Sequence, residues 1–195
     1  MVGLPGVFLG LLVWLFAAEP RRGKGDLIIP PKQKGVGEVL RTMWSSPSLR
    51  WIGLILTMVP ITGFSFIIWG ASFFRRVHGM SQAETGFWLG SAMAIGLVAG
   101  NIVAGLVADK FGKNNPGFNG WFAGLGLLVA FPLALTFSLT SNVYLAIACF
   151  VGMKFMMTLH LGPIIALSFA QVPVSMRAMM SATINMFIGL AGTGV

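Results

Sequence analysis

The strongest constraint on the fold of this chain is a series of apolar runs, each suited to form one helix across a lipid bilayer. Crossing about 30 Å of hydrocarbon takes roughly 20 helical residues. Six runs approach or exceed this length, and they cover residues 2–18, 49–74, 83–108, 118–139, 143–170 and 177–195. The sequence therefore predicts an all-α, polytopic transmembrane helical bundle of about six spans. We expect the first and last spans to be incomplete and the chain to be a fragment of a larger protein.

The composition also favours lipid over water as the solvent of this chain. Only 9% of the residues are charged and the mean hydropathy is +0.85, whereas about a quarter of the residues in a soluble domain are charged. The net charge of +8 does not indicate nucleic acid, because the basic residues lie between apolar runs rather than on one polar face. We expect an integral protein of the inner or plasma membrane, with membrane lipids as partners.

The distribution of Lys and Arg predicts the orientation of the spans. If residues 19–50 are cytoplasmic and the spans alternate, ten basic residues lie on the cytoplasmic side and two on the outer side. This is a strong positive-inside bias. The cytoplasmic set is Arg21, Arg22, Lys24, Lys32, Lys34, Arg41, Arg50, Lys110, Lys113 and Arg177, and the outer set is Arg75 and Arg76.

Residues 19–48 form the long polar stretch of the sequence. Pro30 and Pro31 interrupt regular structure early in it. The later part repeats apolar residues at helical spacing, which predicts a short amphipathic helix at the membrane surface. These residues are Val36, Val39, Leu40, Met43 and Trp44.

One connection between spans carries a recognisable motif. Gly105 is followed by Leu, Val, Ala, Asp109, Lys110, Phe, Gly112 and Lys113. This resembles the signature loop of the major facilitator superfamily, which lies between helices 2 and 3 and, more weakly, between helices 8 and 9. With a long basic loop upstream, the resemblance implies helices 8 and 9. Residues 1–18 would then end helix 6, residues 19–48 would be the central cytoplasmic loop, and residues 49–195 would be the C-terminal half, helices 7 to 11, without helix 12.

Three short segments, 19–23, 76–81 and 172–178, resemble the Spinster-like branch of that superfamily. The resemblance implies a secondary transporter that works by alternating access and is coupled to protons or another ion. Its implied substrates are lysophospholipids, sphingolipids or small organic anions. The missing N-terminal half would be a partner and would supply the proton-coupling acid.

The resemblance implies that the motif is a conformational latch, and physical chemistry gives this role a rationale. The Asp109 carboxylate can face the N-terminus of a helix from the missing half, where free N–H groups favour negative charge. Lys110 and Lys113 would hold the loop to headgroups or carbonyls, and Gly112 would permit a tight turn. The alternative is a solvated turn whose lysines only set the topology.

Lys154 and His160 are the ionisable residues inside the span 143–170. Lys154 lies about 16 Å from the start of that span at 1.5 Å per residue, where a charge is costly unless it has a partner or a cavity. It would line the substrate pathway and attract an anion, or form a structural pair with an acid from the missing half. His160 would take part in proton coupling or simply be hydrogen bonded.

Other polar and helix-breaking residues complete the candidates. Asn101 and Asn185 are polar groups inside spans, and they need partners or a cavity. Pro60, Pro132 and Pro163 are candidate hinges, or residues tolerated for packing. Three glycine pairs have the spacing of close helix contacts; they are Gly86 with Gly90, Gly96 with Gly100, and Gly120 with Gly124.

Two other classes of function compete with transport. A membrane-embedded enzyme would need a catalytic cluster, and neither a His, Asp or Glu metal cluster nor a serine with an evident base is present. We therefore expect no enzyme, no metal and no cofactor. A non-transporting scaffold or receptor is the remaining alternative, and Lys154, the Asp109 motif and the prolines within spans argue mildly against it.

Overall fold

The structure is a computed structural model that describes residues 6–7, 11, 15–16, 35–112 and 115–193. It divides the chain into two compact units, Met1–Lys32 and Gln33–Val195. In the first unit the described residues are helical. Most of the predicted span 2–18 and of the predicted loop 19–48 lies outside the described residues, so the domain boundaries stay a prediction.

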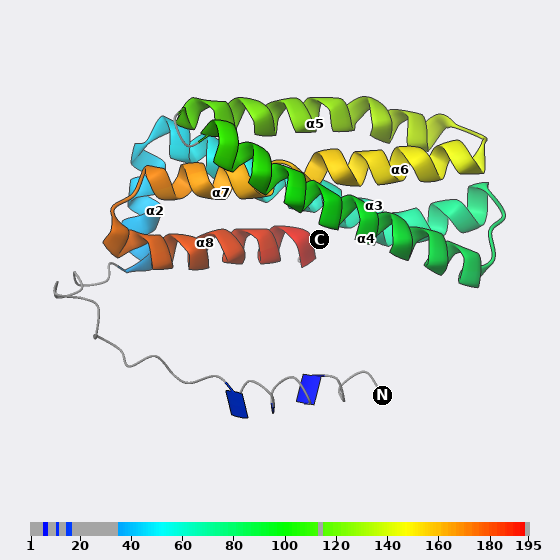
Figure 1. Ribbon diagram of the computed structural model, residues 1–195, viewed down its shortest axis with the longest axis horizontal. Coiled ribbons are helices and arrows are strands. Elements are labelled where there is room, and N and C mark those ends of the chain that lie inside the picture. The colour runs from blue at the N-terminus through cyan, green and yellow to red at the C-terminus, as the bar shows by residue number, and fades with distance from the viewer. Residues whose placement is uncertain (1–5, 8–10, 12–14, 17–34, 113–114, 194–195) are drawn as a thin grey trace. The chain divides into compact units, whose positions relative to one another are not determined.

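The second unit is built from helices, and its described residues contain no strand. They are α2 (Val36–Ser45), α3 (Pro47–Val77), α4 (Gln82–Val107), the π-helical turn η1 (Ala108–Gly112), α5 (Pro116–Leu139), α6 (Val143–Thr158), α7 (Leu161–Ala170) and α8 (Val174–Thr193). Figure 1 shows α3 to α8 extending along one common direction, with α2 at one end.

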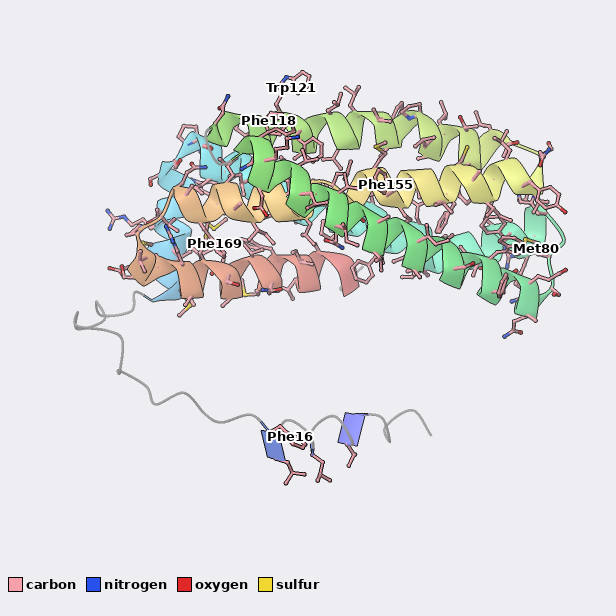
Figure 2. All side chains as sticks on the ribbon, viewed as in Figure 1. Phe16, Met80, Phe118, Trp121, Phe155 and Phe169 are labelled. Atoms are coloured by element: carbon pink, nitrogen blue, oxygen red, sulfur yellow. The ribbon has the colours of Figure 1, made fainter. Side chains whose placement is uncertain are left out.

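Five stretches are long and apolar enough to cross a membrane. They are Pro47–Val77, Gln82–Gly112, Gly117–Leu139, Val143–Ala170 and Val174–Gly192. This confirms the five spans predicted between residues 49 and 195. Large apolar side chains also point outward, as Trp121 does from α5 (Figure 2), where 71% of its surface is exposed. Such a surface is suited to hydrocarbon rather than to water.

Polar residues at the connections define where the helices begin. Ser81 and Glu84 form a capping box at the start of α4, in which each side chain accepts a hydrogen bond from the other residue's backbone N–H. Asn142 accepts hydrogen bonds from the backbone N–H groups of Tyr144 and Leu145 at the start of α6. These caps satisfy N–H groups that have no partner inside the helix. They fix the turns on the predicted outer side.

The bundle has two apolar cores, one toward each end. The core near α2 joins the first half of α3 to α7 and α8, and its central side chains are rich in methionine. They include Met43, Met176 and Met180, all at most 6% exposed. The other core joins the end of α3 to α4, α5 and α6, and Phe74, Phe137 and Phe150 are at its centre. The rings of Phe137 and Phe150 lie 5.5 Å apart between centroids.

The glycine pairs behave differently from one another. A Cβ atom placed on Gly96 would lie 2.9 Å from Cβ of Lys154, and one on Gly100 would lie 2.9 Å from the carbonyl oxygen of Phe155. These two glycines therefore permit α4 and α6 to approach closely. Around Gly86 and Gly90 nothing lies within 4 Å of that position, so this pair makes no such contact within the described residues.

In the third pair, Gly120 lies near another helix and Gly124 does not. At Gly120 the position of a Cβ atom lies 3.7 Å from Leu167, and at Gly124 it has no neighbour within 4 Å among the described residues. Glycine spacing alone is therefore a poor predictor of close helix contact.

Candidate functional site

Lys154 lies where three helices meet. It belongs to α6, only 4% of its surface is exposed, and its Nζ donates a hydrogen bond of 2.8 Å to the carbonyl oxygen of Gly63 on α3. The ammonium nitrogen also lies 5.6 Å from the centre of the Phe150 ring. The close approach of Gly96 brings α4 against the base of the same side chain. The lysine is therefore held between α3, α4 and α6.

The charge of Lys154 has no acidic partner in the described part of the chain. The carbonyl of Gly63 is its one hydrogen-bond partner there, and no ion pair is formed with Glu38, Glu84 or Asp109. A carbonyl and an aromatic face stabilise an ammonium group, but less than a carboxylate would. A buried ammonium group that has no carboxylate partner can still bind an anion.

The span that contains Lys154 is broken in the middle. Helix α6 ends at Thr158 and α7 begins at Leu161, two residues before Pro163. A proline lacks the N–H that would bond to the carbonyl four residues earlier, and its ring crowds that carbonyl, here that of Leu159. In contrast, α3 and α5 continue without interruption through Pro60 and Pro132. Of the three candidate hinges, Pro163 alone accompanies a break in these described helices.

His160 lies at this break and is 7% exposed. Its Nδ1 is hydrogen bonded to the carbonyl oxygen of Met157, which would lack a regular helical partner because the helix ends there. The hydroxyl of Thr158 donates a hydrogen bond of 2.8 Å to the carbonyl oxygen of Lys154. Polar side chains thus bond to two carbonyls in the last turn of α6, just before the break, which fits the hydrogen-bonded alternative for His160.

Asn101 and Asn185 lie on exposed faces of α4 and α8. Each Nδ2 donates a 2.9 Å hydrogen bond to the carbonyl four residues earlier, that of Leu97 or Ser181. Each amide therefore finds a partner within its own helix. The four pathway candidates divide into a buried pair, Lys154 and His160, and this exposed pair.

The Asp109 motif is helical rather than a loop. Gly105 lies in α4, and residues Ala108–Gly112 continue that helix as η1. Asp109 and Lys110 are exposed on η1, and Lys113 lies outside the described residues. The expected span 83–108 is helical as predicted, and the expectation of a loop directly after it is wrong for residues 109–112.

The predicted reason for Gly112 is also wrong. Among the described glycines with a positive φ, the structure gives Gly79 alone, so Gly112 does not adopt a turn that requires glycine. Instead, a Cβ atom on Gly112 would collide with the side-chain amide of Asn119 on α5. Gly112 is needed because two helices approach each other here.

Asn119 was missed by the sequence analysis. It is 7% exposed, and its Oδ1 has no hydrogen-bond partner among the described residues. Together with Asp109 and Gly112 it lines a hollow of about 550 Å³ between η1, α5 and α7. An amide near the start of the apolar run 118–139 was the available signal, because a buried polar group needs a reason.

Both the sequence and the fold of the chain are similar to those of known proteins. The family described as the Major Facilitator Superfamily matches residues 1–194. Two similar crystal structures are of a bacterial homolog to the human lysosomal transporter Spinster, inward-facing, one unoccupied and one occupied. Both are 29% identical and cover 99% of this chain, with TM-scores of 0.75 and 0.72. A search among curated proteins finds no match.

The chain spans 41% and 39% of the length of those two structures, which agrees with half of a transporter bundle. The predicted resemblance to Spinster-like proteins is thereby confirmed. Together with the five apolar spans, the comparisons establish an integral membrane protein. The chain belongs to the Major Facilitator Superfamily.

Proposed function

We propose that this chain forms one half of a secondary transporter that moves a lipid-like or organic anion by alternating access. Its described part would be helices 7 to 11, and the complementary half would close the cavity. The observation that carries the proposal is Lys154, a buried lysine without an acidic partner among the described residues. Such a charge inside a membrane bundle is costly unless it serves an ion or substrate pathway.

Lys154 would attract the anionic group of the substrate. The ammonium group already binds the carbonyl of Gly63 and faces Phe150, so an arriving anion would compete with the carbonyl for its protons. Since Gly63 belongs to α3 and Lys154 to α6, substrate binding would loosen one contact between these helices. The break before Pro163 would give α7 freedom to move relative to α6. Proton or ion coupling would involve residues of the complementary half.

The motif at the end of α4 would latch one conformation. Asp109 is exposed on η1 beside the hollow that Asn119 lines. A helix N-terminus from the complementary half would place its free N–H groups against this carboxylate. The exposed Asn101 and Asn185 would meet the same half, because contact of these amides with hydrocarbon would be costly.

The experiment is uptake by proteoliposomes that contain the complete transporter with this half. The probes are labelled lysophosphatidylglycerol and labelled lysophosphatidylcholine, with and without a proton gradient. We expect gradient-driven uptake of the anionic probe and a loss of at least about tenfold in Lys154→Met, because a hydrogen bond to a charged group contributes on the order of 1.5–3 kcal/mol. Arg76→Gln, at the exposed end of α3, is the matched control and should transport normally.

The absence of gradient-driven uptake of either probe in the wild type, together with normal folding, would favour the scaffold or receptor alternative. Equal uptake of both probes, unchanged in Lys154→Met, would show that this lysine has only a structural role.

A further inference from the structure

An apolar groove lies at the end of the bundle where α2 meets α3 and α8. Its volume is about 640 Å³, and it extends along α3 from Arg50 to Thr57. This is a length of about 10 Å at 1.5 Å per residue. Leu40, Leu54 and Phe187 give its walls an apolar character. The groove therefore has the size and chemistry to hold part of a hydrocarbon chain.

Two arginines line the same groove. Arg41 comes from α2 and Arg50 from the first turn of α3, and both are exposed. Neither guanidinium group forms a hydrogen bond or an ion pair with any residue that the structure describes, although Glu38 lies about one helical turn before Arg41. The groove thus combines an apolar interior with two positive charges that no acidic side chain among the described residues compensates.

The surroundings place this groove at the level of lipid headgroups. Trp44 on α2 and Trp51 on α3 are 78% and 68% exposed, and tryptophan concentrates where hydrocarbon meets headgroups. Arg50 and Trp51 also line a second hollow of about 300 Å³ beside the groove. The positive-inside distribution puts this end of α3 on the cytoplasmic side.

We propose that this groove is a binding site for one anionic phospholipid of the cytoplasmic leaflet. Arg41 and Arg50 bind the headgroup phosphate, and an acyl chain lies between α3 and α8 against Leu54 and Phe187. Basic pockets between helices at the cytoplasmic surface suit such headgroups, and a guanidinium group suits phosphate because it donates two parallel hydrogen bonds. The proposal does not depend on the transported substrate.

The floor of the groove can adapt to its occupant. A Cβ atom on Gly53 would lie 3.3 Å from Cε of Met43, and both residues line the groove. Methionine is flexible and fills irregular spaces. Gly53 has no side chain, so a larger residue at this position would fill part of the groove in which we place the acyl chain.

The test is native mass spectrometry of the purified protein in detergent with phosphatidylglycerol, phosphatidylcholine or inorganic phosphate. We expect one phosphatidylglycerol molecule to be retained in preference to phosphatidylcholine, and phosphate alone to be retained weakly. The double variant Arg41→Gln/Arg50→Gln should lose about tenfold in affinity for phosphatidylglycerol. Gly53→Leu should weaken both lipids, because it blocks the apolar part of the site.

The control is Arg75→Gln/Arg76→Gln, which removes the same charge from the opposite end of α3 and should bind phosphatidylglycerol as the wild type does. An equal loss in this control, or equal retention of the two lipids by the wild type, overturns the proposal. So does a Gly53→Leu variant that destabilises the complete transporter without changing lipid retention, because that outcome means a protein segment fills the groove.

Discussion

Two contacts made by glycines show how differently the middle of this bundle and its end near α2 are packed. At the seam between α4 and α6, Gly100 faces the backbone carbonyl of Phe155 and Cβ of Thr158. At the contact between α2 and α3, Gly53 faces only the terminal methyl group of Met43. The backbone of a helix cannot move aside without displacing the helix, whereas a methionine methyl group can.

This difference separates a rigid region from an adaptable one. The α4–α6 seam adjoins Lys154 and the phenylalanine core, so it holds the candidate pathway residue in a fixed position. The α2–α3 contact adjoins the methionine-rich core and the proposed lipid groove. We infer that the lysine is held by rigidly packed helices in the middle of the bundle and that the end near α2 can change its packing.

The largest effect is expected from Gly100→Ala. The new methyl group would lie 2.9 Å from the Phe155 carbonyl oxygen, and α4 and α6 would have to separate. Overpacking of this kind costs about 1–3 kcal/mol. The measurement is the free energy of unfolding in mixed micelles by titration with sodium dodecyl sulfate.

Gly90→Ala is the matched control, because it changes the same helix where no atom lies within 4 Å. It should leave stability unchanged or raise it by up to about 1 kcal/mol, since alanine favours helix more than glycine does. If both variants lose stability equally, the seam is not tighter than the rest of α4.

A smaller effect is expected from Gly112→Ala at the end of η1. The new methyl group would meet the amide of Asn119, a side chain that can shift but is buried. We expect a loss of about 1 kcal/mol and its recovery in the double variant Gly112→Ala/Asn119→Ser, because serine is shorter. The coupling energy from the four proteins of this double-mutant cycle is the measurement.

Gly105→Ala tests whether the motif glycines are equivalent. Gly105 belongs to the same motif but has no neighbour within 4 Å among the described residues, so this variant should keep the stability of the bundle. Failure of Asn119→Ser to rescue Gly112→Ala would mean that Gly112 is required for a reason other than its contact with Asn119.

The sequence predicted the helical spans well, because their length and apolar character depend on the residues of each span alone. It predicted the close contact of Gly96 and Gly100 but gave the same prediction for Gly86 and Gly90, which have no such contact. Glycine spacing shows only that one face of a helix carries small residues. A close contact also requires another helix packed against that face.

The candidate site was less predictable for the same reason. The depth of Lys154 in its span follows from counting residues, but its bond to Gly63 joins positions 91 residues apart. Asn119 and Gly112 likewise meet only because α5 folds back against η1. The π-helical form of residues 108–112 was missed because Asp, Lys and Gly together resemble a turn.

The smallest effect is expected from Gly53→Ala, which tests the adaptable end of the comparison. The methyl group would approach Cε of Met43 to 3.3 Å, and rotation about the methionine side-chain bonds should relieve this contact. The gain in helix propensity offsets the remaining cost, so stability should stay within about 0.5 kcal/mol of the wild type. Gly53→Ala combined with Met43→Ile removes this flexibility, because a β-branched side chain is restricted at χ1. If Gly53→Ala is neutral alone but costs stability in that combination, Met43 is what makes this end of the bundle adaptable. A loss as large as that of Gly100→Ala in the single variant would mean that both regions are equally rigid.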